Sequence, residues 1–155
     1  MKFRIRGLDP APFRPLYGLP AAALAAALAE RHVADASPGF PDRIELVDAR
    51  PGEALLLVNY VHQPAANPYR ASHAIFVREG AARAYDAVDA IPPALAIRPL
   101  SLRGFDASDR LVAAELADGE AQRAAILRLL AEPRVAYLQA HYARMGCYAA
   151  RIERA

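Results

Sequence analysis

The chain has 155 residues, a formal net charge of +2, 55% hydrophobic residues and one cysteine. This length suits a single domain that buries roughly two thirds of the surface exposed by its unfolded form. The lone cysteine excludes an internal disulfide and indicates a reducing compartment, so we expect a cytoplasmic protein. Neither a signal-peptide core nor a run of roughly twenty apolar residues is visible, so we expect neither secretion nor a membrane partner.

The distribution of charge and the missing motifs disfavour several classes of function. The arginines are scattered and form no basic stripe with interleaved aromatic residues, so we expect no nucleic-acid partner. There is no glycine-rich phosphate loop and no Gly-x-Ser-x-Gly turn, and Lys2 is the only lysine. P-loop hydrolases, lysine Schiff-base enzymes and α/β-hydrolases are therefore disfavoured.

The first third of the chain predicts short elements separated by proline and glycine. Residues 3–6 alternate apolar and charged side chains, which is typical of a half-buried strand. Proline then breaks the chain, and Pro20 can begin a helix that runs to about residue 30. Residues 31–36 and 43–48 predict further strands, the second with Ile44 and Leu46 on one face.

The middle of the chain predicts a central strand and its antiparallel partner. Residues 53–60 are apolar on both faces, which indicates a buried strand, and residues 72–79 form its expected partner. The loop between them, about ten residues long, exceeds the usual hairpin loop, and long loops between rigid strands are frequently functional.

The last third predicts a short helix, two strands, a longer helix and a final hairpin. Asp118 is expected to cap the longer helix and Pro133 to stop it. The predicted segments are a helix from Pro92-Pro93, strands at 99–105 and 110–117, and a hairpin of 135–142 with 147–152. We expect an α+β fold: a single domain with one mostly antiparallel, twisted β-sheet and two main helices packed on it.

The polar groups between the two central strands form the first candidate site. They are Tyr60, His62, Tyr69, Arg70, Ser72 and His73. Arg70 suits a carboxylate or phosphate, although it could instead pair with an acidic side chain or cap loop carbonyls. His73 shares strand parity with Ile75 and Val77, so it is either a hydrogen-bonded core histidine or a base in a pocket formed with His62.

The C-terminal hairpin supplies a third histidine and the only thiol. Parity places Tyr137, Gln139 and His141 on one strand face, which is either a solvated stripe or part of a site. A three-residue turn, which we favour, puts Cys147 on the face of His141. A four-residue turn puts it on the opposite face. Cys147 is then a candidate nucleophile or a small core residue.

The function predicted from these residues is a pocket for a small anionic molecule, formed by the 59–73 loop and the C-terminal hairpin. If the protein is an enzyme, His73 or His141 is the expected base and Cys147 the expected nucleophile. The histidine and cysteine spacings match no metal-ligand pattern, so we predict neither metal nor cofactor. The alternative is a non-catalytic binding module, or a homo-oligomer formed through an exposed strand.

Three stretches also resemble a bacterial family catalogued as domain of unknown function 1203. They are GFPDRIELVDARPGEALLLVNY at 39–60, HQPAANPYRASHAIFVREGA at 62–81 and RVAYLQAHYARMGCYAARIER at 134–154. The resemblance implies that Arg70, Ser72, His73, His141, Gly146 and Cys147 fit the family pattern. It also implies an acidic residue where this chain has Val61, and a histidine and an asparagine in place of Gln139 and Tyr142. A His-x-His or Glu-His site is therefore incomplete here.

Overall fold

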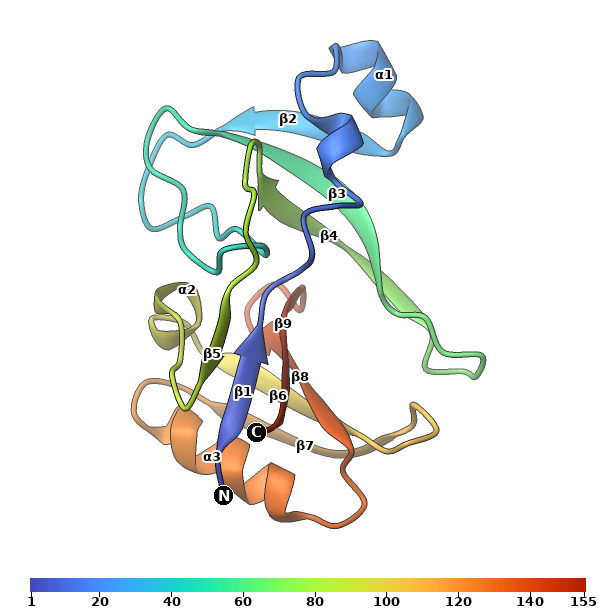
Figure 1. Ribbon diagram of the computed structural model, residues 1–155, viewed down its shortest axis with the longest axis vertical. Coiled ribbons are helices and arrows are strands. Elements are labelled where there is room, and N and C mark those ends of the chain that lie inside the picture. Colours follow the sequence, from blue (N-terminus) through green and yellow to red (C-terminus); the bar gives the residue numbers. More distant parts are fainter.

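The computed structural model describes residues 1–155, and its nine strands form two antiparallel sheets (Figure 1). In sheet order, the larger one contains β5 (Asp86–Val88), β1 (Phe3–Arg6), β9 (Tyr148–Arg154), β8 (Tyr137–Tyr142), β6 (Leu100–Phe105) and β7 (Leu111–Ala117). The smaller one contains β2 (Ala29–Val33), β3 (Ala54–Gln63) and β4 (Ala71–Arg78). The predicted α+β class is confirmed, but the strands are divided between two sheets instead of one.

Three α-helices and a short 3-10 helix at Arg14–Leu16 complete the fold. They are α1 (Ala21–Ala26), α2 (Pro93–Ala96) and α3 (Ala121–Ala131). α3 covers the larger sheet and buries Ile126, Leu129 and Leu130, as its sequence predicts (Figure 1). No side chain caps its first turn, so the predicted cap at Asp118 is wrong. None of the helices is both long and apolar enough to cross a membrane.

Two hydrophobic cores lie on the two sides of the molecule and meet at β9. The larger core fills the space between α3 and the six-stranded sheet and includes Ala149, Ala150 and Ile152 of β9. The smaller core packs the three-stranded sheet against the N-terminal segment and includes Tyr148, the first residue of β9. The start of the last strand therefore joins the two sheets.

Two predictions in the first half of the chain are corrected by the backbone. The helix from Pro20 ends at Ala26 because Leu28 adopts a positive φ of 55° and the chain turns into β2. Residues 43–48 form no strand, since Leu46 also has a φ of 55°. Leu46 is nevertheless fully buried, as the alternation suggested.

The β3–β4 pair has the predicted antiparallel register and contains an irregularity near its end. Tyr60 pairs with His73, but the next pair joins Gln63 to Ala71, so β3 carries one residue more than β4 over this interval. Such a bulge bends a strand and redirects its side chains. β3 therefore continues to Gln63, and the connecting loop shrinks to residues 64–70.

Candidate functional site

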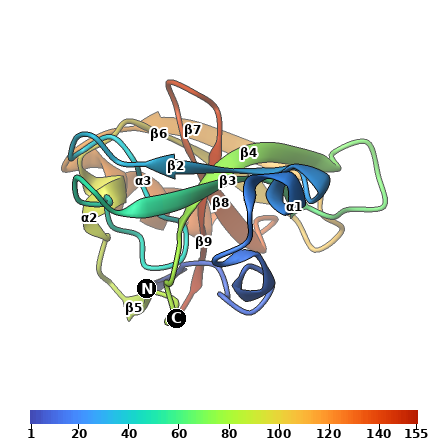
Figure 2. The ribbon, with the colours of Figure 1, turned by 90° about the horizontal axis from the view of Figure 1, so that it is seen from above.

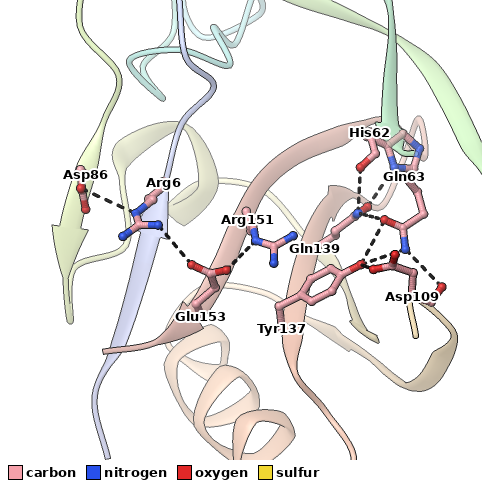
Figure 3. Close-up of polar contacts among 9 residues, drawn as sticks. All are labelled: Arg6, His62, Gln63, Asp86, Asp109, Tyr137, Gln139, Arg151 and Glu153. Carbon is pink, nitrogen blue, oxygen red and sulfur yellow. Dashed lines mark hydrogen bonds and ion pairs between the residues drawn. The ribbon is translucent and has the colours of Figure 1, made fainter. Parts of the chain in front are cut away.

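The predicted polar column on β8 is buried under the end of β3. Tyr137, Gln139 and His141 are 6%, 2% and 0% exposed, so the solvated-stripe alternative is wrong. His62 and Gln63, the last two residues of β3, lie over the column (Figure 3). Alternation alone would turn consecutive residues to opposite faces, so the bulge is what lets both reach β8.

Gln139 lies at the centre of a hydrogen-bond network that joins the end of β3 to β8. Its Nε2 donates to the carbonyl of His62 and to Oε1 of Gln63, both at 3.0 Å. Its Oε1 lies 2.9 Å from Nδ1 of His62 and 3.1 Å from Nε2 of His141. Tyr137 continues the network by donating to Asp109 at 2.7 Å (Figure 3). These polar groups are satisfied mainly by one another, which describes a closed structural network.

His141 is the most strongly perturbed histidine of the chain. Burial, followed by the positive charge of Arg103, lowers the pKa of His141 to about 3. Its ring is therefore neutral and carries one N–H for two oxygen neighbours, Oε1 of Gln139 and the carbonyl of Gly146 at 3.1 Å. Burial also lowers the pKa of His62, whose ring lies edge-on to His141 with centroids 4.9 Å apart.

The histidines do not assemble a metal centre. His62 stacks on the ring of Tyr148, which is tilted against Tyr60. No group of three histidine, cysteine or acidic side chains lies close enough together to hold a metal ion. His62, His141 and Tyr60 thus meet in an aromatic cluster between the two sheets.

Cys147 lies on the opposite face of the hairpin from His141, and the predicted three-residue turn is wrong. The amide of Tyr142 donates to the carbonyl of Cys147 at 2.9 Å, so four residues, 143–146, form the turn. Gly146 still supplies a positive φ, of 75°. Because side chains alternate along a strand, the longer turn separates Cys147 from His141 and places it beside Tyr142.

A buried arginine contacts the Cys147 thiol. Arg43 is 2% exposed; its Nε donates to the carbonyl of Tyr148 at 2.8 Å and its Nη2 lies 3.1 Å from Sγ of Cys147. Nη1 donates to the carbonyl of Pro41. No carboxylate forms a salt bridge with this guanidinium, whose pKa is lowered by burial. A guanidinium has five N–H groups, so two of them remain for another acceptor.

Arg43 lines a cavity of about 640 Å³ between β4, the segment after α2 and the β8–β9 turn. Its charged side chains are those of Arg43, Arg98 and Arg144, and no acidic residue is part of the wall. Arg98 forms a bidentate pair with Asp48 at 2.6 and 2.7 Å, whereas Arg144 is exposed and forms no salt bridge. The cavity is therefore cationic.

Tyr142 adds an unused hydrogen-bond donor to the same wall. Its ring lies under the guanidinium groups of Arg43 and Arg98, at 4.8 and 5.2 Å from the ring centroid. Its hydroxyl is buried and has no hydrogen-bond partner. Burial raises the pKa of Tyr142 to about 12, so the hydroxyl keeps its proton and can donate.

The predicted site residues are divided among three places. His73 and Cys147 line the cavity, while Tyr60, His62 and His141 belong to the aromatic cluster. Tyr69, Arg70 and Ser72 are exposed and line neither. His73 is half-buried, with Nδ1 3.0 Å from the carbonyl of Ala74, and is not a fully buried core residue.

The residues missed from the sequence are those with the most unusual surroundings. Arg43 was the first residue of a predicted strand, Arg98 lay between the expected short helix and the next strand, and Tyr142 looked like one apolar residue of a strand. The only available signal was the proximity of Tyr142 to the turn that carries Cys147.

Comparison with known proteins places residues 39–154 within one family model, described as protein of unknown function (DUF1203). The chain belongs to this family. The match spans the cavity and the polar network, and it leaves out β1, α1 and β2. No curated protein and no solved structure matches the chain.

Proposed function

We propose that this DUF1203 protein binds a small anionic molecule in the cavity lined by Arg43, Arg98 and Tyr142. The single observation that carries the proposal is the buried guanidinium of Arg43, which has no carboxylate partner and lies over the ring of Tyr142, whose hydroxyl is also unpartnered. Both groups are hydrogen-bond donors, so the group that satisfies them is an acceptor, and the surrounding positive charge favours an anion.

The energetic cost of these groups supports a ligand role over a purely structural one. A buried charge without a counter-ion costs several kcal/mol, and a buried hydroxyl without a partner costs about 1–3 kcal/mol. Structural arginines in this chain avoid that cost, since Arg98 has Asp48 and Arg78 has Glu45. An anion in the cavity would supply Arg43 with the partner it lacks.

The predicted catalytic roles stay predictions, with a changed geometry. His73 and Cys147 line the cavity, but His141 points to the other face of the hairpin and cannot activate the thiol directly. A reaction in the cavity would therefore use Cys147 with Arg43 and His73. Binding without chemistry needs none of these additional roles, and it is the function that we propose.

Self-association and location also stay proposals. β2 and β7 are edge strands, and Val33 and Leu116 are 59% and 74% exposed on them, which is compatible with pairing to a second copy. The buried free thiol is compatible with a reducing, cytoplasmic location.

Thermal unfolding in the presence of phosphates and carboxylates tests the anion site. A ligand at 100 times its Kd stabilises the folded state by about 2.7 kcal/mol. We expect Arg144→Gln to weaken this response, because the arginine lines the cavity, and Arg70→Gln to leave it unchanged. The two arginines are both exposed and unpaired, so they form a matched pair. An equal loss in both variants would indicate general charge screening, and a wild type without any response would refute the proposal.

A further inference from the structure

We propose that the anion is the terminal carboxylate of a peptide, whose last residues add a strand to the free edge of β4. This inference rests on the proposed anion site and names the chemical class that it takes. The observations that carry it are the unpaired amides along β4, the direction in which the edge is blocked, and the apolar side chains at the rim of the cavity.

The outer edge of β4 carries two unused donors. The carbonyl of Phe76 accepts from the amide of Arg43 at 3.1 Å, and the amide of Arg78 donates to Asp42 at 2.7 Å, both away from β3. Backbone groups alternate along a strand, so the amide of Ala74 points the same way as that of Phe76. Neither amide has an acceptor within the protein.

The two residues that carry these donors lie at the cavity. Ala74 and Phe76 both line it, and the turn that joins β8 and β9 stands beside β4 in the view from above (Figure 2). The two amides are two residues apart, which corresponds to about 7 Å along a strand. Two carbonyl groups of an extended peptide have the same spacing, so a peptide can accept from both amides at once.

Only the N-terminal half of the outer edge of β4 is free to pair with another strand. The segment around Asp42 and Arg43 already covers β4 from Phe76 onward, so an added strand must end there. Its other end can extend past Ser72, which is exposed. The end that stops at Phe76 faces the wall formed by Arg43 and Tyr142, whose free donors suit a carboxylate. The peptide would therefore run parallel to β4 with its carboxyl terminus at the cavity.

The rim favours an apolar terminal residue. Ile97 and Met145 line the cavity and are 58% and 77% exposed, so both can contact a ligand at its rim. Leu57 and Phe76 are further apolar members of the wall. A leucine-sized side chain next to the carboxylate would cover part of this surface.

Three probes distinguish the contribution of the carboxylate to the affinity from that of the strand pairing. Their binding is measured by calorimetry. They are acetyl-Ala-Ala-Leu with a free carboxylate, its C-terminal amide, and 4-methylpentanoate, which keeps the apolar tail and the carboxylate but has no amide. A charge-assisted hydrogen bond contributes about 1.5–3 kcal/mol, so we expect the amide to bind roughly 10- to 150-fold more weakly than the acid. Two backbone hydrogen bonds predict that 4-methylpentanoate binds at least about fivefold more weakly.

Matched proline variants and hydrogen exchange locate the contact. Ala74→Pro removes an amide that β3 does not use, and proline is tolerated on an edge strand at such a position. Ser72→Pro makes the same change at a residue outside the cavity wall. We expect only Ala74→Pro to weaken the binding of acetyl-Ala-Ala-Leu. In the wild type, the same probe should slow hydrogen exchange at Ala74 and Phe76, a measurement that stands even if a variant fails to fold.

The outcomes distinguish this inference from the anion site itself. If 4-methylpentanoate binds as tightly as acetyl-Ala-Ala-Leu and both amides exchange at unchanged rates, the strand pairing is refuted and the anion site stands. If the peptide amide binds as tightly as the acid, the anion site is refuted as well.

Discussion

The hydroxyl of Tyr142 provides the most direct test of the proposed site. In the free protein this unpartnered hydroxyl should lower the free energy of unfolding, whereas in the complex it should donate a hydrogen bond to the anion. Tyr142→Phe removes a buried hydroxyl that has no partner and keeps the ring beneath Arg43 and Arg98. Relieving an unsatisfied buried group of this kind is worth about 1–2 kcal/mol. In a domain of this size, each kcal/mol raises Tm by about 2–4 °C, so we expect an increase of about 2–8 °C.

Tyr137→Phe is the matched control, because the same atom is removed from a satisfied position. The hydroxyl of Tyr137 donates to Asp109 at 2.7 Å and accepts from Nε2 of Gln63 at 2.9 Å. Its loss should therefore lower the free energy of unfolding by about 1–3 kcal/mol. Urea denaturation measures the change in the free energy of unfolding for both variants, which we expect to be positive for Tyr142→Phe and negative for Tyr137→Phe. If Tyr142→Phe destabilises as much as Tyr137→Phe, the Tyr142 hydroxyl is satisfied in solution and the reasoning fails. A stabilised Tyr142→Phe protein should also bind anions more weakly.

Three further predictions use the thiol, the network and the buried imidazole. Cys147 should react with iodoacetate about fivefold faster, relative to iodoacetamide, than the same thiol in the unfolded chain, because the cavity is cationic; an unchanged ratio by mass spectrometry would contradict a cationic cavity. Gln139→Met should cost about 3 kcal/mol in urea denaturation, since it leaves several buried partners unpaired; a loss under 1 kcal/mol would mean that the network is not tight. The pKa of His141 is lowered to about 3 in the folded protein, so protons bind the unfolded form first and stability falls as pH drops from about 6.5 towards 3. Between pH 7 and pH 5 this loss is about 2 kcal/mol, and it should be absent in His141→Gln.

The sequence predicted the sheet elements where side-chain periodicity was strong. The β3–β4 pair, the separate strands β6 and β7, and the C-terminal hairpin were found near their predicted bounds, because burial leaves an apolar pattern in the sequence, which in β3 is a run apolar on both faces. The division into two sheets was missed, since no local pattern specifies which strands pair across the chain. β5 was missed because three residues carry no periodicity.

The site was predicted only in part, and the reason lies in backbone irregularities. One bulge aims His62 and Gln63 together at β8, and a turn longer by one residue moves Cys147 to the other face. Both features shift side-chain parity by one residue, which alternation cannot detect. Arg70 was preferred to Arg43 because polar loops usually hold ligand-binding arginines, whereas the burial of Arg43 depends on contacts with residues 105 positions away.

Buried polar groups are mostly hydrogen-bonded on one face of the β8–β9 hairpin and partly unsatisfied on the other. This contrast favours a ligand in the cavity. On the His141 face, most buried donors and acceptors find partners within the protein, as expected for groups that fix how two sheets pack. On the Cys147 face, an arginine and a tyrosine keep unused donors although the same strands surround them. The fold can therefore satisfy buried polar groups a few ångströms away and does not do so here. Donors that cost stability, on residues that line a cationic cavity, are best explained by an acceptor that arrives from outside.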